Sequence, residues 1–400
     1  MENIKTRFKT PLSSLHINII AIIAIIAVNF IIYGHTLNSS FHFDDDGTIT
    51  NNNLILNPKN VFLKYNERPI YNLSFAINYY FGKFNTFGYH MVNLLLHCLN
   101  GILVYFVVLF TLKLPVLNSS FKNREQKIAF FTALIFVAHP IRAESVIYLS
   151  SRSVALFSFF YLCCLLCFIF SQYKAHLKNL FYFLAFISSL LALASKEAAV
   201  TLPFAVILFD FMLVSNLNFA EIKKRWKFYA LLFSTLLLSI YIVVYGHITG
   251  AYGKTSAAGF GTPFVTPFNY LLTEFSVVLY YIILFLFPAN LNLDYDWHYA
   301  KSLFEFPTFF SFLVLIGIVI LVIKIFKSKP LYAFWIIWYF LVLSPDSSIV
   351  PLKDVIFLHR AYLPSLGPIL LFVIGIDKAV QYLGNKLQFK SKGQPKNPSI

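Results

Sequence analysis

The chain has 400 residues, of which 58% are hydrophobic and only 12% are charged, and 46 of them are phenylalanine. Soluble domains contain about 45–50% apolar residues, so this composition excludes a soluble globular protein and indicates an all-α polytopic membrane protein. The formal net charge of +15 does not indicate nucleic-acid binding, because the lysines and arginines lie in clusters that flank apolar runs.

Apolar runs long enough to cross about 30 Å of hydrocarbon recur along the chain. The positive-inside rule assigns the basic clusters to the cytoplasmic side. The expected crossings, in chain order, are 15–34, 89–112, 128–138, 154–173, 181–194, 198–214, 228–245, 309–323, 331–344 and 362–380.

One further apolar segment, 270–287, is long enough to cross but conflicts with the charge pattern. A crossing there would put Lys324, Lys327 and Lys329 on the outer side. We expect this segment to be re-entrant or to lie along the membrane interface, so that the chain has about 10–11 transmembrane helices. Residues 1–384 then form one transmembrane domain with a long first outer loop at 35–88. Residues 385–400 are expected to be a basic, polar cytoplasmic tail.

On this topology the unusual polar residues fall at the outer ends of the spans. The acids are Asp44, Asp45, Asp46, Glu144 and Glu197, and the basic or imidazole groups are Arg68, His90, His139, Arg142, Arg152, Lys196, His359 and Arg360. Ionisable groups at membrane depth are candidates for a functional site. A carboxylate opposite several cations suits group transfer from a phosphate, because the carboxylate takes the acceptor's proton and the cations hold the departing phosphate.

Two simpler interpretations stay open. A pair such as Arg142 and Glu144 could be a salt bridge that only holds helix ends together. His90 and His97 lie seven residues apart on one helix face, and packing is favoured over metal binding for them. No cofactor is expected. The aspartates could hold a divalent metal, but this is not favoured.

Six stretches carry a resemblance to a known family: "FDDDGTITNN", "RPIYNLSFAINYYFGKFNTFGYHMVNLLLHCLNGILVY", "AHPIRAESVIYLSSRSVAL", "SKEAAVTLPFAVILFD", "LDYDW" and "HRAYLPSLG". Over about residues 41–367 the chain resembles the membrane part of the transmembrane and tetratricopeptide-repeat O-mannosyltransferases and their bacterial relatives. These are GT-C glycosyltransferases, which take a sugar from a polyprenyl phosphate on the outer or lumenal side. The repeats are absent here.

The resemblance implies a GT-C helical bundle and an inverting transfer, mannose being the first candidate sugar, to a hydroxyl of a protein or glycan. Asp44 and Asp45 match the family's acidic pair, and one of them is expected to be the catalytic base. Arg152, Lys196 or Arg360 would hold the donor phosphate. Arg68, His90, His139, Glu144, Glu197 and His359 would complete the cavity. Two departures from the family pattern are Arg142, where a second histidine is frequent, and Leu358, where an acid is frequent.

The expected location is the bacterial inner membrane, with the active site on its outer face. The expected partners are the bilayer, a polyprenyl-phosphate sugar and the acceptor, with no nucleic acid. The alternative function is a transporter or flippase of a lipid-linked sugar. A transporter is expected to show broken mid-membrane helices and an internal repeat, whereas the ionisable groups here collect at one surface.

Overall fold

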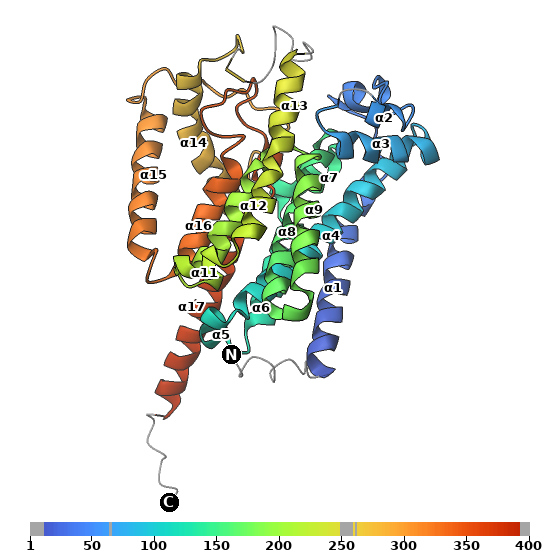
Figure 1. The fold of residues 1–400 in the computed structure, drawn as a ribbon. Coiled ribbons are helices and arrows are strands. Elements are labelled where there is room, and N and C mark those ends of the chain that lie inside the picture. Colours follow the sequence, from blue (N-terminus) through green and yellow to red (C-terminus); the bar gives the residue numbers. More distant parts are fainter. Residues whose placement is uncertain (1–11, 64–65, 249–258, 261, 393–400) are drawn as a thin grey trace, which may run out of the picture.

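A computed structural model describes residues 12–63, 66–248, 259–260 and 262–392 as a helical bundle (Figure 1). No β-strand occurs in these ranges. The first nine helices are α1 (Leu12–Tyr33), α2 (Asn60–Leu63), α3 (Pro69–Gly82), α4 (Thr86–Leu112), α5 (Pro115–Phe121), α6 (Glu125–Ala138), α7 (Ala143–Ile147), α8 (Arg152–Tyr173) and α9 (Lys178–Leu193). They are followed by α10 (Leu202–Phe209), α11 (Phe219–Lys223), α12 (Trp226–Ser234), α13 (Leu236–Ile248), α14 (Pro267–Leu286), α15 (Phe306–Ile325), α16 (Pro330–Leu343) and α17 (Leu366–Lys392). Single turns of 3-10 or π-helix lie between them: η2 (Gly34–Thr36), η3 (Asp46–Thr50), η4 (Pro140–Arg142), η5 (Leu149–Ser151), η6 (Ala175–Leu177), η7 (Glu197–Thr201), η8 (Asp210–Val214) and η9 (Leu358–Ala361).

The lengths and composition of these helices confirm an all-α polytopic membrane protein. Eight described helices are long and apolar enough to cross a membrane, and nine if the bent pair α6–α7 counts as one span. Two further expected crossings coincide with the shorter apolar helices Trp226–Tyr241 and Pro330–Leu343. Each expected crossing therefore corresponds to a helix.

Local sequence explains where several helices begin. Proline occupies the first turn of α3, α5, α14 and α16, where a missing backbone N–H costs nothing. The side chain of Asn85 accepts a hydrogen bond from the Phe87 N–H and so caps α4. Pro140 marks a bend of 56° after α6, because proline cannot continue the hydrogen-bond ladder of that helix. The bend turns residues 140–148 away from the axis of α6.

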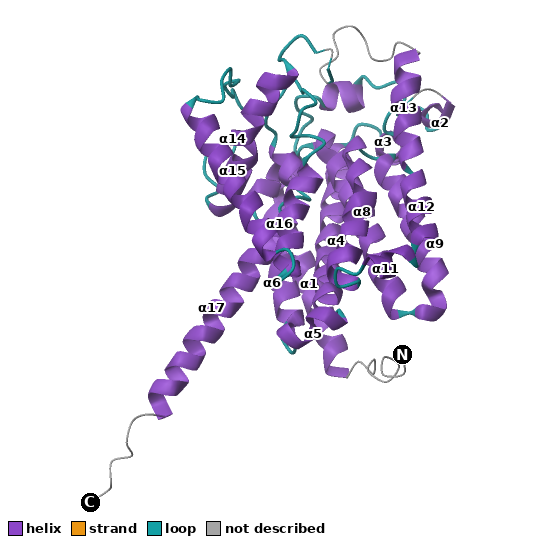
Figure 2. Ribbon diagram, turned by 60° about the vertical axis from the view of Figure 1, so that its left-hand side comes forward, coloured by secondary structure: helices purple, strands orange, loops and turns teal. Residues whose placement is uncertain are grey.

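The two ends of the bundle differ in charge. Figures 1 and 2 show α2 and α3 at the upper end, and α5, α11 and the far end of α17 toward the lower end. Basic residues border α5, α11 and the α15–α16 turn, among them Lys122, Arg225 and Lys327. The three aspartates 44–46 belong to the long segment between α1 and α3 at the upper end. This separation agrees with the distribution that the sequence predicts.

Helix α14 stays in the upper part of the bundle, although it is long and apolar enough to span. Near its start, the Tyr270 hydroxyl donates to the Asp346 carbonyl, just beyond the upper end of α16. Near its end, the Phe285 carbonyl bonds to His139, which lies just beyond α6. Both ends of α14 thus contact residues at the upper ends of other helices. These contacts agree with the expectation that segment 270–287 does not cross from one end to the other.

The core lies where α4, α6, α8 and α9 pack together, and α16 and α17 close it on another side. Close approach is possible because glycines face their neighbours. A Cβ atom on Gly101 of α4 would lie 2.4 Å from a side-chain carbon of Val137 on α6. A Cβ atom on Gly367 of α17 would lie 2.3 Å from the Trp335 carbonyl oxygen on α16. Neither helix pair can accept a larger residue at these contacts without moving apart.

Candidate active site

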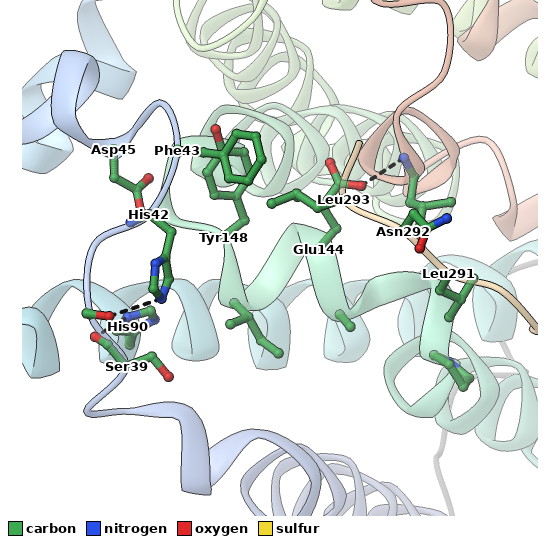
Figure 3. A pocket seen from close by; sticks show the side chains of 15 residues that line it. Ser39, His42, Phe43, Asp45, His90, Glu144, Tyr148, Leu291, Asn292 and Leu293 are labelled. Atoms are coloured by element: carbon green, nitrogen blue, oxygen red, sulfur yellow. Dashed lines mark hydrogen bonds between the residues drawn. The ribbon is translucent and has the colours of Figure 1, made fainter. Parts of the chain in front are cut away.

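A cavity of about 390 Å³ lies at the upper end, and we call it the upper cavity. Segments far apart in the sequence form its walls, and Figure 3 shows the first long loop and His90 on one side, residues 291–293 on the other, and Glu144 and Tyr148 between them. Its lining residues are Ser39, Ser40, His42, Phe43, Asp45, His90, Pro140, Ala143, Glu144, Ile147, Tyr148, Leu291, Asn292, Leu293 and Leu358. The bend at Pro140 brings the 140–148 stretch into this wall.

Asp45 is buried, and both of its carboxylate oxygens are occupied. Oδ1 accepts hydrogen bonds from the backbone N–H (2.9 Å) and the hydroxyl (2.7 Å) of Ser150. Oδ2 accepts one from the His42 N–H at 3.1 Å. Asp45 therefore fastens the first long loop to the turn before α8, and its carboxylate has little freedom to meet a substrate.

Asp44 is exposed, and one of its carboxylate oxygens is vacant. The Tyr148 hydroxyl donates to Oδ2 at 2.7 Å and accepts from the Asp44 N–H at 3.1 Å. No described residue donates to Oδ1. Burial, together with the bond to Asp44, raises the pKa of Tyr148, so this hydroxyl stays a donor at neutral pH. Asp44 is not itself a lining residue of the upper cavity, but it is held by Tyr148, which is, and one of its carboxylate oxygens stays open.

Asp46 lies outside this arrangement. It is exposed, and its Oδ1 accepts a hydrogen bond from the Thr50 hydroxyl at 3.1 Å within the same helical turn. The three adjacent aspartates therefore have three different environments.

Glu144 and His359 form a pair that joins the upper cavity to the segment before α17. Glu144 Oε1 is hydrogen-bonded to His359 Nδ1, and Oε2 accepts from the Leu358 N–H at 2.9 Å. The His359 ring stacks on Phe357 with centroids 5.0 Å apart. The pairing fixes which ring nitrogen of His359 faces Glu144.

Lys196 and Arg360 belong to a buried charged cluster near His359. Lys196 Nζ lies 2.8 Å from Asp346 Oδ2. The terminal nitrogens of Arg360 donate to the carbonyls of Val355 (2.8 Å) and Asp354 (2.6 Å). Burial alone would raise the pKa of Asp346, but Lys196 and Arg360 outweigh it and lower that pKa to about 2. Asp346 is therefore an ionised counterion in this cluster.

Arg152 is fully buried, and its donors are committed inside the protein. They bond to Asn93 Oδ1 (2.7 Å), Asn78 Oδ1 (2.7 Å) and the Tyr89 carbonyl (2.9 Å), and the guanidinium lies 4.0 Å from the centre of the Phe75 ring. These partners belong to α3 and α4. Arg152 does not line the upper cavity, and its contacts tie α8 to these two helices.

Arg68 and Glu197 form a two-point ion pair, with nitrogen–oxygen distances of 2.9 and 2.5 Å. The pair is partly open to solvent, with 32% of the Arg68 side chain and 63% of the Glu197 side chain exposed. It joins the first long loop to the start of η7.

The other predicted histidines and Arg142 have mainly structural contacts. His90 lines the cavity and bonds the Ser39 carbonyl through Nε2, whereas its buried Nδ1 has no partner among the described residues. His139 bonds the Phe285 carbonyl, and His97 bonds the Tyr362 hydroxyl. Arg142 is buried and donates to the carbonyls of Ala361 and Tyr362. Within the described ranges, no group of three or more His, Cys, Asp or Glu side chains is arranged to hold a metal ion.

Four residues of this region were not singled out from the sequence: Tyr148, Ser150, Asp346 and Glu274. Tyr148 and Ser150 lie inside the quoted stretch "AHPIRAESVIYLSSRSVAL", and Asp346 is the only acid in "LSPDSSIV" after an apolar run, so proximity to a span end could have indicated them. Glu274 sits inside α14 and is buried, beside Tyr270 and Ser347. An acid within an apolar helix was the available signal for it.

Comparison with known proteins gives several matches to proteins named as protein O-mannosyl-transferases. The chain is 31% identical to the human protein O-mannosyl-transferase TMTC4 over 168 residues, which cover 40% of this chain and 22% of that protein. It is 29% identical to human TMTC1 over 157 residues, covering 37% of this chain and 17% of the relative. A longer match, at 23% identity over 298 residues, is to the Caenorhabditis elegans protein O-mannosyl-transferase F38B6.6, covering 69% of this chain and 39% of the relative.

The chain spans only about a fifth of the length of the two human relatives. No protein-family model and no solved structure gives a significant match. The predicted resemblance is confirmed to this extent: the homologues of this multi-pass membrane protein are TMTC-type protein O-mannosyl-transferases.

Proposed function

We propose that this protein is a GT-C glycosyltransferase that moves a sugar, mannose in the first instance, from a polyprenyl phosphate to a hydroxyl group of a protein. The homologues are named as protein O-mannosyl-transferases, which supports a transfer of mannose to protein. The polyprenyl carrier and the inverting stereochemistry rest on the family resemblance of the motifs. A glycan hydroxyl is the alternative acceptor.

The observation that carries the proposal is the difference between Asp44 and Asp45. Asp45 has both oxygens occupied by Ser150 and His42, whereas Asp44 keeps one vacant oxygen and is oriented by Tyr148. In the proposed reaction the acceptor oxygen attacks the anomeric carbon, its proton passes to Asp44, and the bond from that carbon to the phosphate oxygen breaks. The lipid phosphate leaves with the bonding electron pair. A base of this kind contributes about 10²–10⁴-fold.

We propose Lys196 and Arg360 as the cations nearest to the departing phosphate. Both lie in the charged cluster that Glu144 and His359 link to the upper cavity. Arg152 is given a positioning role instead, because it is fully buried, all three of its guanidinium nitrogens donate to acceptors on α3 and α4, and it lies outside this charged cluster. No metal ion is part of the proposed mechanism.

We place the upper end of the bundle on the outer face of the membrane, because the basic residues gather at the lower end. The polyprenyl chain would then remain in the outer leaflet while its phosphate reaches the cavity. A bacterial inner membrane is one setting for this arrangement.

The test is to incubate the purified chain in nanodiscs with radiolabelled polyprenyl-phosphate mannose and a peptide rich in serine and threonine. Transfer of label to the peptide, retained in Asp46→Asn but lost in Asp44→Asn, is the expected result. If the chain instead moves the sugar lipid between leaflets of a vesicle without breaking it down, it is a flippase and the proposal is wrong.

A further inference from the structure

The leaving group poses an electrostatic problem that the sequence does not reveal. In the proposed function, on which this inference rests, the donor phosphate has one negative charge before transfer and two afterwards. The nearby cations already have partners: Lys196 is paired with Asp346, and the terminal nitrogens of Arg360 donate to backbone carbonyls. The phosphate therefore needs a further positive group.

His359 is placed to supply that charge. Its Nδ1 is held by Glu144, and the ring stacks on Phe357, so the imidazole is oriented before any ligand arrives. No described residue bonds to Nε2, and 17% of the side chain is exposed. The ring thus offers one nitrogen to a ligand, and imidazole is the side chain whose ordinary pKa lies closest to neutral pH.

The charges around His359 come from several elements. Glu144 of α7 is its hydrogen-bonded partner; Arg360 follows it in η9; and Lys196 and Asp346 face it from the starts of η7 and of the loop after α16. Arg142 of η4, which packs against η9, donates to the carbonyls of Ala361 and Tyr362. Glu274 of α14 lies near Arg360.

We propose that His359, held in place by Glu144, takes up a proton when the lipid phosphate binds and then donates a hydrogen bond from Nε2 to that phosphate. The proton comes from solvent, is accepted by the lone pair of Nε2, and returns to solvent when the product leaves. Glu144 is a positioning residue that also stabilises the imidazolium.

The resting state is consistent with this cycle. Burial lowers the pKa of His359, Glu144 offsets part of this effect, and Lys196 and Arg360 lower the pKa further, so in the empty protein the ring takes up a second proton less readily than an exposed imidazole does. A bound phosphate adds negative charge beside the ring and raises the pKa. Phosphate affinity should then fall as pH rises between the two pKa values, by up to about tenfold per pH unit.

The experiment measures proton uptake directly. Farnesyl phosphate is titrated calorimetrically into the full chain in nanodiscs at pH 7, in two buffers with different enthalpies of ionisation. The dependence of the heat on the buffer gives the number of protons taken up. The wild type should take up more protons per phosphate than His359→Gln, by up to about one. The titration of the phosphate itself is common to both proteins and cancels in this comparison.

His298→Gln is the matched control, because His298 also faces a glutamate, Glu305 at 3.5 Å, but is exposed and lies outside the cluster. It should behave as the wild type. Equal uptake by the wild type and His359→Gln overturns this proposal alone, whereas absence of any binding by the wild type overturns it together with the proposed phosphate site. If His359→Gln does not fold, Glu144→Gln decides, since unchanged uptake in that variant is also contrary to the proposal.

Discussion

Asp210 at the lower end of the bundle and Asp44 at the upper end are both acids beside a tyrosine hydroxyl, but their surroundings differ. Asp210 is fully buried and accepts from Arg225 through both oxygens, at 3.0 and 2.9 Å, from Ser215 at 2.7 Å and from Tyr229. Asp44 has Tyr148 as its single side-chain donor and one vacant oxygen. A carboxylate whose two oxygens both have donors, such as Asp210, holds helix ends together. A carboxylate with an oxygen that lacks a donor, such as Asp44, can act on a ligand.

The largest effect is expected at Asp210. The change Asp210→Asn leaves Arg225 without its counterion in a buried site, so the free energy of unfolding should fall by about 3–5 kcal/mol. Thermal melting of the purified protein in detergent measures this. Glu221→Gln is the control from the same end, because the Glu221–Lys224 pair is exposed and should contribute no measurable stability. Equal melting temperatures for the two variants would contradict the role of Asp210 in holding the helix ends together.

The next effect is on transfer rather than on stability. Asp44→Asn is nearly isosteric but removes the proton acceptor, so turnover should fall by about 10²-fold or more with the melting temperature unchanged. Asp45→Asn places an amide N–H against the His42 N–H, and we expect it to lose stability and turnover together. Asp46→Asn should lose least. Near-wild-type transfer by both Asp44→Asn and Asp45→Asn would exclude the proposed mechanism.

Variants of Arg152 test whether this residue, predicted from the sequence to bind the phosphate, instead stabilises the packing of the helices. Arg152→Lys keeps the charge but loses the forked donors to Asn93 and Asn78, so the free energy of unfolding should fall by about 2–3 kcal/mol. Melting and donor binding are measured side by side. If the variant is as stable as the wild type but binds the donor more weakly, Arg152 is a phosphate ligand, as the sequence predicts.

Asp346 gives a pH-dependent effect of about 2 kcal/mol, since its pKa falls from 3.8 to about 2 on folding. A lowered carboxyl pKa contributes stability that is present above pH 4 and is lost as pH falls through about 2. The melting temperature of the wild type should therefore decrease more steeply between pH 4 and pH 2 than that of Asp346→Asn. Parallel curves for the two proteins would show that the pair with Lys196 contributes nothing.

The smallest effect belongs to the partly exposed pair Arg68–Glu197. Solvent screens this pair, so Glu197→Gln should change the free energy of unfolding by less than about 1 kcal/mol, despite the two-point geometry. Denaturation at low and high salt measures the change. A larger loss of stability would show that the Arg68–Glu197 pair, like Asp210, holds helix ends together.

The crossings could be predicted because each depends on a contiguous apolar run. For α14 the prediction rests on three lysines that restrict the side on which the next turn lies, and the contacts of both helix ends agree with it. The roles of Asp44 and Asp45 could not be separated, because they depend on Tyr148 and Ser150, about 100 residues further along the chain. The same holds for Lys196, whose partner Asp346 is 150 residues away. The burial of Arg152 likewise depends on how α3 and α4 pack.

The contact between Gly101 and Val137 has a consequence for the width of the upper cavity. His90 is eleven residues before Gly101 on α4, or about 16 Å along the helix, and Pro140 follows Val137 by three residues. The contact between Gly101 and Val137 therefore sets the distance between α4 and α6, and this distance in turn sets how far apart His90 and Pro140 lie in the cavity wall. A single added methyl group at Gly101 would push α4 and α6 apart and displace the wall that contains His90, without contacting any residue that lines the cavity. A displacement of about 1 Å can lower the rate of a reaction 10²-fold. Gly101 is therefore needed for the geometry of the site, although it takes no part in the chemistry.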